Sequence, residues 1–266
     1  MLIRPFKTRA QACARLGALL GALLAPPCHA DTANAPPNGW SGLASASLAL
    51  NGGSTDSATA LLNVDLARKL SQSKTSVLAM LNYSEALVDG RRETAAHKWL
   101  LSAQQDRNIN DQWFAFAKGS IDGDRIQELN RRTKLSTGLG IHVLAEEANT
   151  FDVFAGFSYG DRRYRRPQTL HGTTSDHFQR PGGILGEEST HQLSESVTVK
   201  QRFEAYPDFS RVHAHSANFN GSLGVVLTQR LSLSVTLSST FNQYAPPGVA
   251  RTDNALFTGF SLRLGG

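Results

Sequence analysis

Cysteine is nearly absent from this 266-residue chain, because Cys13 and Cys28 are its only two and both lie in the first thirty residues. The remainder therefore has no disulfide framework and no cysteine-ligated metal site. Long hydrophobic runs are missing there too, since no stretch approaches the 18 uninterrupted apolar residues of a membrane-spanning helix. Helix patterns are scarce as well. Ser57–Leu70 could form an amphipathic helix, but its alternating apolar residues favour a strand.

A large charge of one sign is also lacking once the first thirty residues are set apart. The whole chain has 27 Lys and Arg against 22 Asp and Glu. Four of the basic residues and none of the acidic ones lie in residues 1–30, which leaves 23 against 22. A balance so close to neutral gives no support for a nucleic-acid partner.

Residues 1–30 have the pattern of a cleaved secretory signal peptide. A basic start is followed by the apolar run Leu16–Ala25, two prolines and a short segment with small residues at its ends. We predict cleavage before Asp31, export through the inner membrane, and a short periplasmic leader over residues 31–38. Lipidation of Cys28 is the alternative, although the proline directly before it fits that poorly.

The rest of the chain alternates apolar and polar residues, most clearly over Leu231–Ser238. Successive side chains of a strand point to opposite faces, so such a strand meets an apolar and a polar environment at once. We expect twelve such strands over residues 39–266, and many reach the ~9–11 residues that a tilted strand needs to cross a bilayer. Their expected bounds are 39–50, 57–70, 74–88, 93–105, 111–122, 130–145, 150–161, 183–193, 197–209, 214–228, 231–244 and 254–264.

Two further patterns favour a membrane barrel over a soluble sandwich or a lipocalin-like barrel. Short turns alternate with longer polar loops, as periplasmic turns and external loops do. Aromatic residues of the apolar face gather near both strand ends, as two membrane interfaces favour. They are Trp40, Trp113 and Phe151 at one end, and Tyr83, Tyr159, Phe209 and Phe241 at the other. We therefore predict an all-β fold, a transmembrane antiparallel up-and-down β-barrel of about twelve strands. It would lie in the bacterial outer membrane among lipid and lipopolysaccharide, with both termini in the periplasm.

The last predicted strand contains Gly259-x-x-Leu262-x-Leu264, which resembles the insertion signal that the outer-membrane barrel assembly machinery reads. This machinery is therefore an expected partner during insertion. Two glycines follow at the position where that signal usually has a terminal aromatic residue.

Four motifs carry a resemblance to a known family. They are Trp40-Ser41-Gly42, Leu193–Gln201, Leu227–Leu233 and, the most specific, Tyr244–Asp253. Their order is similar to that in the salt-induced outer-membrane proteins, the YdiY-like domain of unknown function, over about residues 38–264. The first hairpin differs, because Asn51–Thr55 stands where that family tends to have Gly-Asn followed by Ser or Thr. The resemblance implies an outer-membrane barrel and supplies no substrate, activity or catalytic residue.

Three short patterns could carry chemistry, and each also has an ordinary structural interpretation. Ser189 and His191 share a strand face, as a serine nucleophile and its base would, but the sequence identifies no partner for the histidine. Asp122-Gly123-Asp124 is also a common turn. His213 and His215 lack a third metal ligand. We predict no catalytic residue, no metal site and no cofactor, so we do not expect an enzyme.

The inward face of the barrel is the main candidate for function. Its predicted charges are eight basic and five acidic, namely Lys69, Lys98, Lys118, Arg132, Lys134, Lys200, Arg202 and Arg263 against Asp65, Asp152, Glu188, Glu204 and Asp208. The candidate selectivity residues are Lys118, Arg132, Lys134, His142, Lys200, Arg202 and Glu204. Such a lumen is either a plug of cross-barrel ion pairs or a narrow polar channel, and inward Phe114, Phe116 and Phe154 favour partial filling. An open lumen with this basic excess would favour anions mildly.

A basic external loop is the second candidate site. Between Gly160 and Arg180 it has five arginines, Arg162, Arg163, Arg165, Arg166 and Arg180, against two aspartates. Arginine suits phosphate oxygens, so this loop could contact lipopolysaccharide, and a solvated mobile loop is equally compatible.

The leading hypothesis for the whole protein is a narrow channel or passive transporter for small polar solutes. The first alternative is a structural or lipopolysaccharide-contacting barrel in envelope or salt stress adaptation. The third is an outer-membrane hydrolase.

Overall fold

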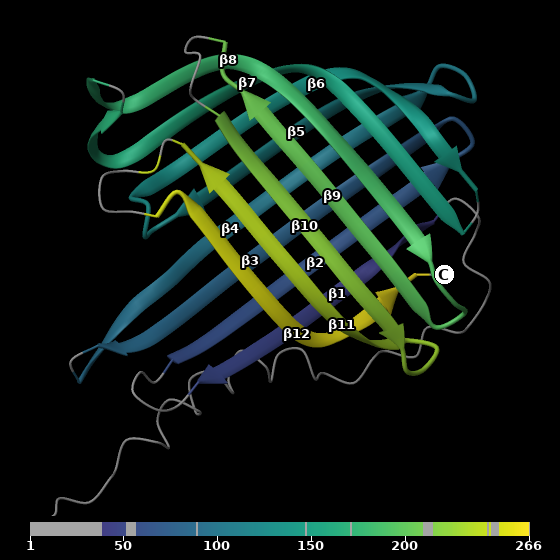
Figure 1. Cartoon of the computed structure of the whole chain (residues 1–266), viewed down its shortest axis with the longest axis horizontal. Coiled ribbons are helices and arrows are strands. Elements are labelled where there is room, and N and C mark those ends of the chain that lie inside the picture. Colours follow the sequence, from purple (N-terminus) through teal and green to yellow (C-terminus); the bar gives the residue numbers. More distant parts are fainter. Residues whose placement is uncertain are drawn as a thin grey trace, which may run out of the picture. The chain divides into compact units, whose positions relative to one another are not determined.

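The computed structural model describes residues 39–51, 57–88, 90–146, 148–170, 172–209, 215–243, 245 and 250–265 (Figure 1). The predicted signal peptide and leader, His213 and part of the Tyr244–Asp253 motif lie outside these residues. In the described part of the chain, every regular element is a strand. No described helix is long and apolar enough to span a membrane.

Twelve strands follow one another along the chain. They are β1 (Trp40–Asn51), β2 (Ser57–Leu70), β3 (Ser73–Val88), β4 (Arg91–Asn108), β5 (Trp113–Asp124), β6 (Leu129–Ala145), β7 (Asn149–Leu170), β8 (Thr173–Gln192), β9 (Val197–Pro207), β10 (His215–Val226), β11 (Leu231–Asn242) and β12 (Thr252–Leu264). Each strand pairs antiparallel with its sequence neighbours, and β1 also pairs with β12, which closes the sheet into an up-and-down barrel. Figure 1 shows β9 to β12 crossing in front of the oppositely tilted strands of the far wall.

The predicted fold, strand number and most strand positions are confirmed, and Ser57–Leu70 is indeed a strand. The largest difference lies in the hairpin of β7 and β8. The predicted loop over residues 161–182 is wrong, because β7 continues to Leu170 and β8 begins at Thr173. The arginines of this segment occupy both inward and outward positions, so the alternation of apolar and polar residues is not evident in the sequence. The extension is held by cross-strand pairing and by an apolar cluster of Leu129, Tyr164, Leu170 and Phe178.

The outer face of the barrel is apolar. On β11, Leu233, Val235 and Leu237 point outward, while the serines and threonines between them point into the lumen. Exposed apolar side chains also occur on the other strands, and Phe157 of β7 is 72% exposed. Exposed aromatic side chains include Trp40 and Trp113 at the starts of β1 and β5 and Phe209 just beyond the end of β9, while Tyr159 is exposed in the middle of the long β7.

The lumen is filled unevenly. On the side formed by β4 to β9, inward side chains are mostly buried, and they are large or charged. On the side formed by β10, β11 and β1, they are mostly small and only partly buried, whereas the inward residues of β12 include the buried Phe257 and Ser261. We call these the filled side and the open side.

Candidate functional site in the barrel lumen

Charged side chains from opposite walls meet in the lumen. Arg202 of β9 pairs with Glu188 of β8 and, at 2.7 Å, with Glu204. Lys118 of β5 pairs with Glu204, and Lys74 of β3 pairs with Glu188 at 2.8 Å. Because β3 and β5 lie across the barrel from β8 and β9, these contacts span the lumen. We call these five residues, together with Asp106 of β4, which lies directly opposite Lys74 on the neighbouring strand, the charge bridge.

Polar neighbours complete the hydrogen bonding of the bridge. Gln104 of β4 accepts a hydrogen bond from Arg202 and donates one to Asp106 at 2.7 Å. The Tyr206 hydroxyl donates to Glu204 at 2.8 Å. With Asp106 included, three cations face three carboxylates, so the bridge is neutral as a whole. Such pairing is what makes buried charges tolerable.

An aromatic cluster packs behind the bridge and fills this side of the barrel. Its buried members are Phe114, Phe116, Phe154, Ile184 and Tyr206. The rings of Phe116 and Phe154 meet edge to face at 5.2 Å. Gly140 and Gly186 make room for two of these rings, because a Cβ at either position would collide with one of them. The predicted inward position of Phe114, Phe116 and Phe154 is confirmed, and it blocks this half of the lumen.

Small polar residues line the open side, and we call this surface the polar wall. It is formed by Asn218, Asn220, Ser222, Ser232, Ser234, Thr236, Ser238, Thr240, Ser261, Ser45 and Ser47. Ser261 joins it across strands, 2.7 Å from Ser45 and 3.0 Å from Ser234. Asn220 of β10 and Lys200 of β9 are both exposed, although their side chains point into the lumen. Solvent therefore reaches both of these side chains inside the lumen.

The end of the barrel with the longer connections also has polar links across the lumen. Lys98 of β4 pairs with Asp253 of β12 and lies 3.4 Å from Asp124. Asn242 of β11 donates a hydrogen bond at 3.0 Å to Gln127, which lies in the connection between β5 and β6. A solute passing along the polar wall would meet these groups first.

The structure brings only part of the predicted selectivity set together. Lys118, Arg202 and Glu204 belong to the charge bridge, and Lys134 lies 3.7 Å from the centre of the Tyr206 ring beside it. Lys200 lies on the same inward face of β9 as Arg202, two residues from it, but it is exposed and forms no salt bridge with the described residues.

The other two predicted residues make separate pairs. Arg132 binds Asp122 through two hydrogen bonds of 3.0 and 2.9 Å, so Asp122 is an ion-pair partner within β5. His142 bonds to Asp152 at 2.7 Å and stacks on the ring of Phe114. Both pairs lie on the filled side and close it further.

Sequence reasoning missed three members of the lumen network, Lys74, Gln104 and Asp106. Lys74 is the first residue of one predicted strand and Asp106 lies one residue past the end of the next, where alternation is easily overlooked. Each nevertheless lies on the inward parity of its strand, and that signal was available in the sequence.

The five predicted external arginines divide between two faces. Arg162 and Arg180 point inward, where Arg162 is buried and Arg180 pairs with Asp208 at 3.2 Å. The prediction that these two are exposed is wrong, because the strand alternation continues through the hairpin. Arg163, Arg165 and Arg166 are exposed as predicted.

The other chemical candidates remain weak in the described chain. Asn149 lies 3.3 Å from the Nδ1 atom of His191, which supplies the missing partner, but the Ser189 hydroxyl is 2% exposed and without a hydrogen bond. Asp124 accepts hydrogen bonds from the turn amides of Ile126 and Gln127. In the described residues, no three His, Cys, Asp or Glu side chains form a metal-sized cluster.

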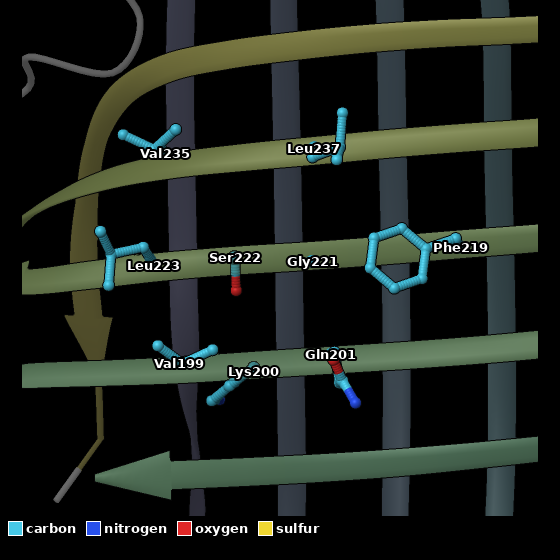
Figure 2. A pocket seen from close by; sticks show the side chains of 9 residues that line it. All are labelled: Val199, Lys200, Gln201, Phe219, Gly221, Ser222, Leu223, Val235 and Leu237. Atoms are coloured by element: carbon cyan, nitrogen blue, oxygen red, sulfur yellow. The ribbon is translucent and has the colours of Figure 1, made fainter. Parts of the chain in front are cut away.

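A shallow hollow lies on the outer side of β9, β10 and β11, as Figure 2 shows. Gly221 forms its floor, and the apolar side chains around it are Val199, Phe219, Leu223, Val235 and Leu237. The hollow exists because Gly221 lacks a side chain between large outward neighbours.

Residues 44–262 match a protein family described as "Protein of unknown function, DUF481". No curated protein matches the sequence. Among solved structures, the chain is similar to the translocator domain of the autotransporter NalP from Neisseria meningitidis, at 13% identity and a TM-score of 0.44, with 95% of this chain and 96% of that one covered. It is also similar to the NanC porin, at 10% identity and a TM-score of 0.46, with 85% of this chain and 98% of that one covered. A third similar structure is the COG4313 outer membrane channel from Pseudomonas putida F1, at 11% identity and a TM-score of 0.44, with 90% of this chain and 100% of that one covered. Likenesses this distant leave the activity open.

Proposed function

We propose a function from the premise that this chain belongs to the DUF481 family, whose description assigns no activity. The protein is a bacterial outer-membrane barrel that forms a narrow passive channel for small polar solutes. The solute path runs along the polar wall, and the charge bridge forms the opposite boundary of that path.

The membrane location rests on the outer face of the barrel. Apolar side chains cover that face, and exposed aromatic residues lie near both strand ends. Lipid-facing barrels have this apolar band with aromatic girdles, and closure satisfies the backbone without water. On the same basis we propose export by a signal peptide cut before Asp31. The intact mass of the membrane-extracted protein checks the cut, and a lipidated Cys28 at its N-terminus would contradict it.

The channel rests on one observation, the exposure of Asn220 and Lys200 inside a lumen whose other side is packed. Narrow pores select by diameter and by the groups that line them. Serine, threonine and asparagine offer both donors and acceptors, so the polar wall can replace water around an uncharged polar solute or a small ion. The proposal has no chemical step, and no residue acts as a catalyst in it.

A pair of adjacent substitutions on β11 tests the channel. Thr236→Trp places a large ring into the lumen from the polar wall, whereas Val235→Trp adds one to the outer face at nearly the same depth. We expect wild type and Val235→Trp to conduct in planar bilayers, and Thr236→Trp to lose most of the single-channel conductance. Wild-type protein that is folded and inserted but does not conduct would overturn the proposal.

We also propose that the protein is one of the salt-induced, YdiY-like members of its family. The support is the order of sequence motifs that ends in Tyr244–Asp253. Measuring the amount of the protein in cells grown at low and at high salt tests this, and an unchanged amount would contradict it.

A further inference from the structure

The outer face of β6, β7 and β8 carries a row of basic residues that the channel does not use. Arg131 of β6 is paired directly with Arg163 of β7, which is in turn paired with His177 of β8. Both arginines are exposed, and Arg165 is exposed close by on the same strand as Arg163. Arg131 lies outside the arginine-rich segment of residues 160–180 and joins it only through strand pairing.

Two arginines directly opposite each other on neighbouring strands repel. Asp161 relieves this repulsion only in part, because its one negative charge is shared between Arg163 and His177. It bonds to His177 at 2.6 Å and lies 3.7 Å from Arg163, while Arg131 has no salt bridge with the described residues. The row therefore has an excess of positive charge that an anion from outside the protein would neutralise.

The outer face next to this row, in the direction of Leu135 on β6 and Tyr159 on β7, suits the acyl chains of a lipid. The next outward row is polar, with Thr133, Asp161 and Gln179, and the row after that begins the apolar band with Leu135 and Tyr159. Further along β6 and β7, the exposed side chains of Leu139 and Phe157 also lie on the outer face. Arg131 and Leu135 are four residues apart, about 13 Å along the strand. A single amphipathic molecule can thus reach both.

This row lies at the end of the barrel with the longer connections, which faces the cell exterior in outer-membrane barrels. From these observations we propose that Arg131 and Arg163, assisted by Arg165, bind a phosphate group of the lipid A part of lipopolysaccharide. The acyl chains lie on the apolar band between Leu135 and Phe157. Arginine is suited to this role because its planar donors match phosphate oxygens in pairs.

The site rests on the proposed membrane location but not on conductance, so the two proposals can fail separately. In the experiment, full-length protein in detergent is titrated with diphosphorylated lipid A, dephosphorylated lipid A and inorganic phosphate. The test variant is Arg131→Gln with Arg163→Gln. The control is Arg107→Gln with Arg230→Gln, which removes the same charge from exposed positions at the opposite, short-turn end.

We expect the test variant to bind diphosphorylated lipid A at least about tenfold more weakly than wild type, while the control binds as wild type does. Dephosphorylated lipid A should bind wild type weakly, and inorganic phosphate should compete only at far higher concentration. Without lipid, the test variant should be at least as resistant to heat as wild type, because a repulsive pair has been removed. Equal binding by wild type and the test variant overturns the proposal. So does inorganic phosphate that binds as tightly as the lipid.

Discussion

The two sides of the lumen are built from strands of the same alternating kind, yet they differ in what the inward positions hold. Outward residues are apolar on both sides, as Leu139 of β6 and Val235 of β11 illustrate. The inward partners are aromatic rings and paired charges on the filled side, and small hydroxyl and amide groups with a single ring, that of Phe257, on the described part of the open side. The outer face therefore decides where the protein resides, and the size of the inward side chains decides whether anything can pass.

Because the charge bridge is neutral as a whole, the number of inward charges does not measure the electric field inside the lumen. Glu204 pairs with Lys118 and Arg202, and Glu188 pairs with Arg202 and Lys74. Asp106 lies opposite Lys74 and supplies the third carboxylate, so the bridge as a whole presents no net charge to the lumen. Counting inward charges overestimates the field on the solute path, since most of those charges cancel within the filled side. Lys200 is exposed and has no salt-bridge partner among the described residues, so it matters more than its share of the count suggests.

Breaking the filled side should produce the largest effect. Glu204→Ala leaves Lys118 and Arg202 without their shared carboxylate in a buried place, so we expect a loss of about 3–5 kcal/mol in the free energy of unfolding. On the open side, Asn220→Ala changes an exposed amide, and the expected loss is within about 0.5 kcal/mol. Urea unfolding of both folded variants in lipid vesicles measures the difference. Similar losses for the two would show that the lumen is equally packed on both sides.

Charge placed on the outer face should be costly on both sides of the barrel. Leu139→Arg on β6 and Val235→Arg on β11 each put a cation against lipid, at an expected cost of roughly 2–4 kcal/mol. Thr236→Arg, next to Val235 but in the accessible part of the lumen, should cost much less.

Heat-modifiability on gels and the yield of assembled barrel compare the three variants. A tolerated Val235→Arg would show that β11 faces away from lipid, and equal losses at Val235 and Thr236 would make the two faces of β11 indistinguishable.

Sequence patterns were sufficient for the closed antiparallel fold, because period-two alternation and turn residues act locally. The inward position of Phe154 or Lys118 follows from parity alone, and both predictions hold. The partner of Lys118 could not be predicted in the same way. Glu204 lies 86 residues further along the chain, and the two meet through the tilt and stagger of the strands, which no short sequence pattern reports.

The β7–β8 extension shows a second limit. The arginine-rich segment looks like a loop because charge dominates its composition, while its apolar residues, Tyr164, Leu170 and Phe178, are widely spaced. They become a cluster only when the two strands pair and bring Leu129 of β6 beside them. The same pairing turns Arg162 inward and sets Arg163 opposite Arg131, so the lipid A site proposed above could not have been found from spacing alone.

The smallest expected effect concerns ion selectivity, and it separates Lys200 from the neutral bridge. Because Lys200 is exposed in the lumen and has no salt-bridge partner among the described residues, it should give the proposed channel a mild preference for anions, which rising salt weakens by screening. Lys200→Glu should move the reversal potential under a salt gradient toward cation preference.

Arg107→Glu is the matched control for this selectivity test, because it makes the same charge reversal on the outside of β4 at the short-turn end. It should leave the reversal potential nearly unchanged, since its charge lies outside the lumen and is screened by solvent. A firm cation preference in wild type, or a channel indifferent to Lys200→Glu, would mean that ions take a path that the polar wall and Lys200 do not line.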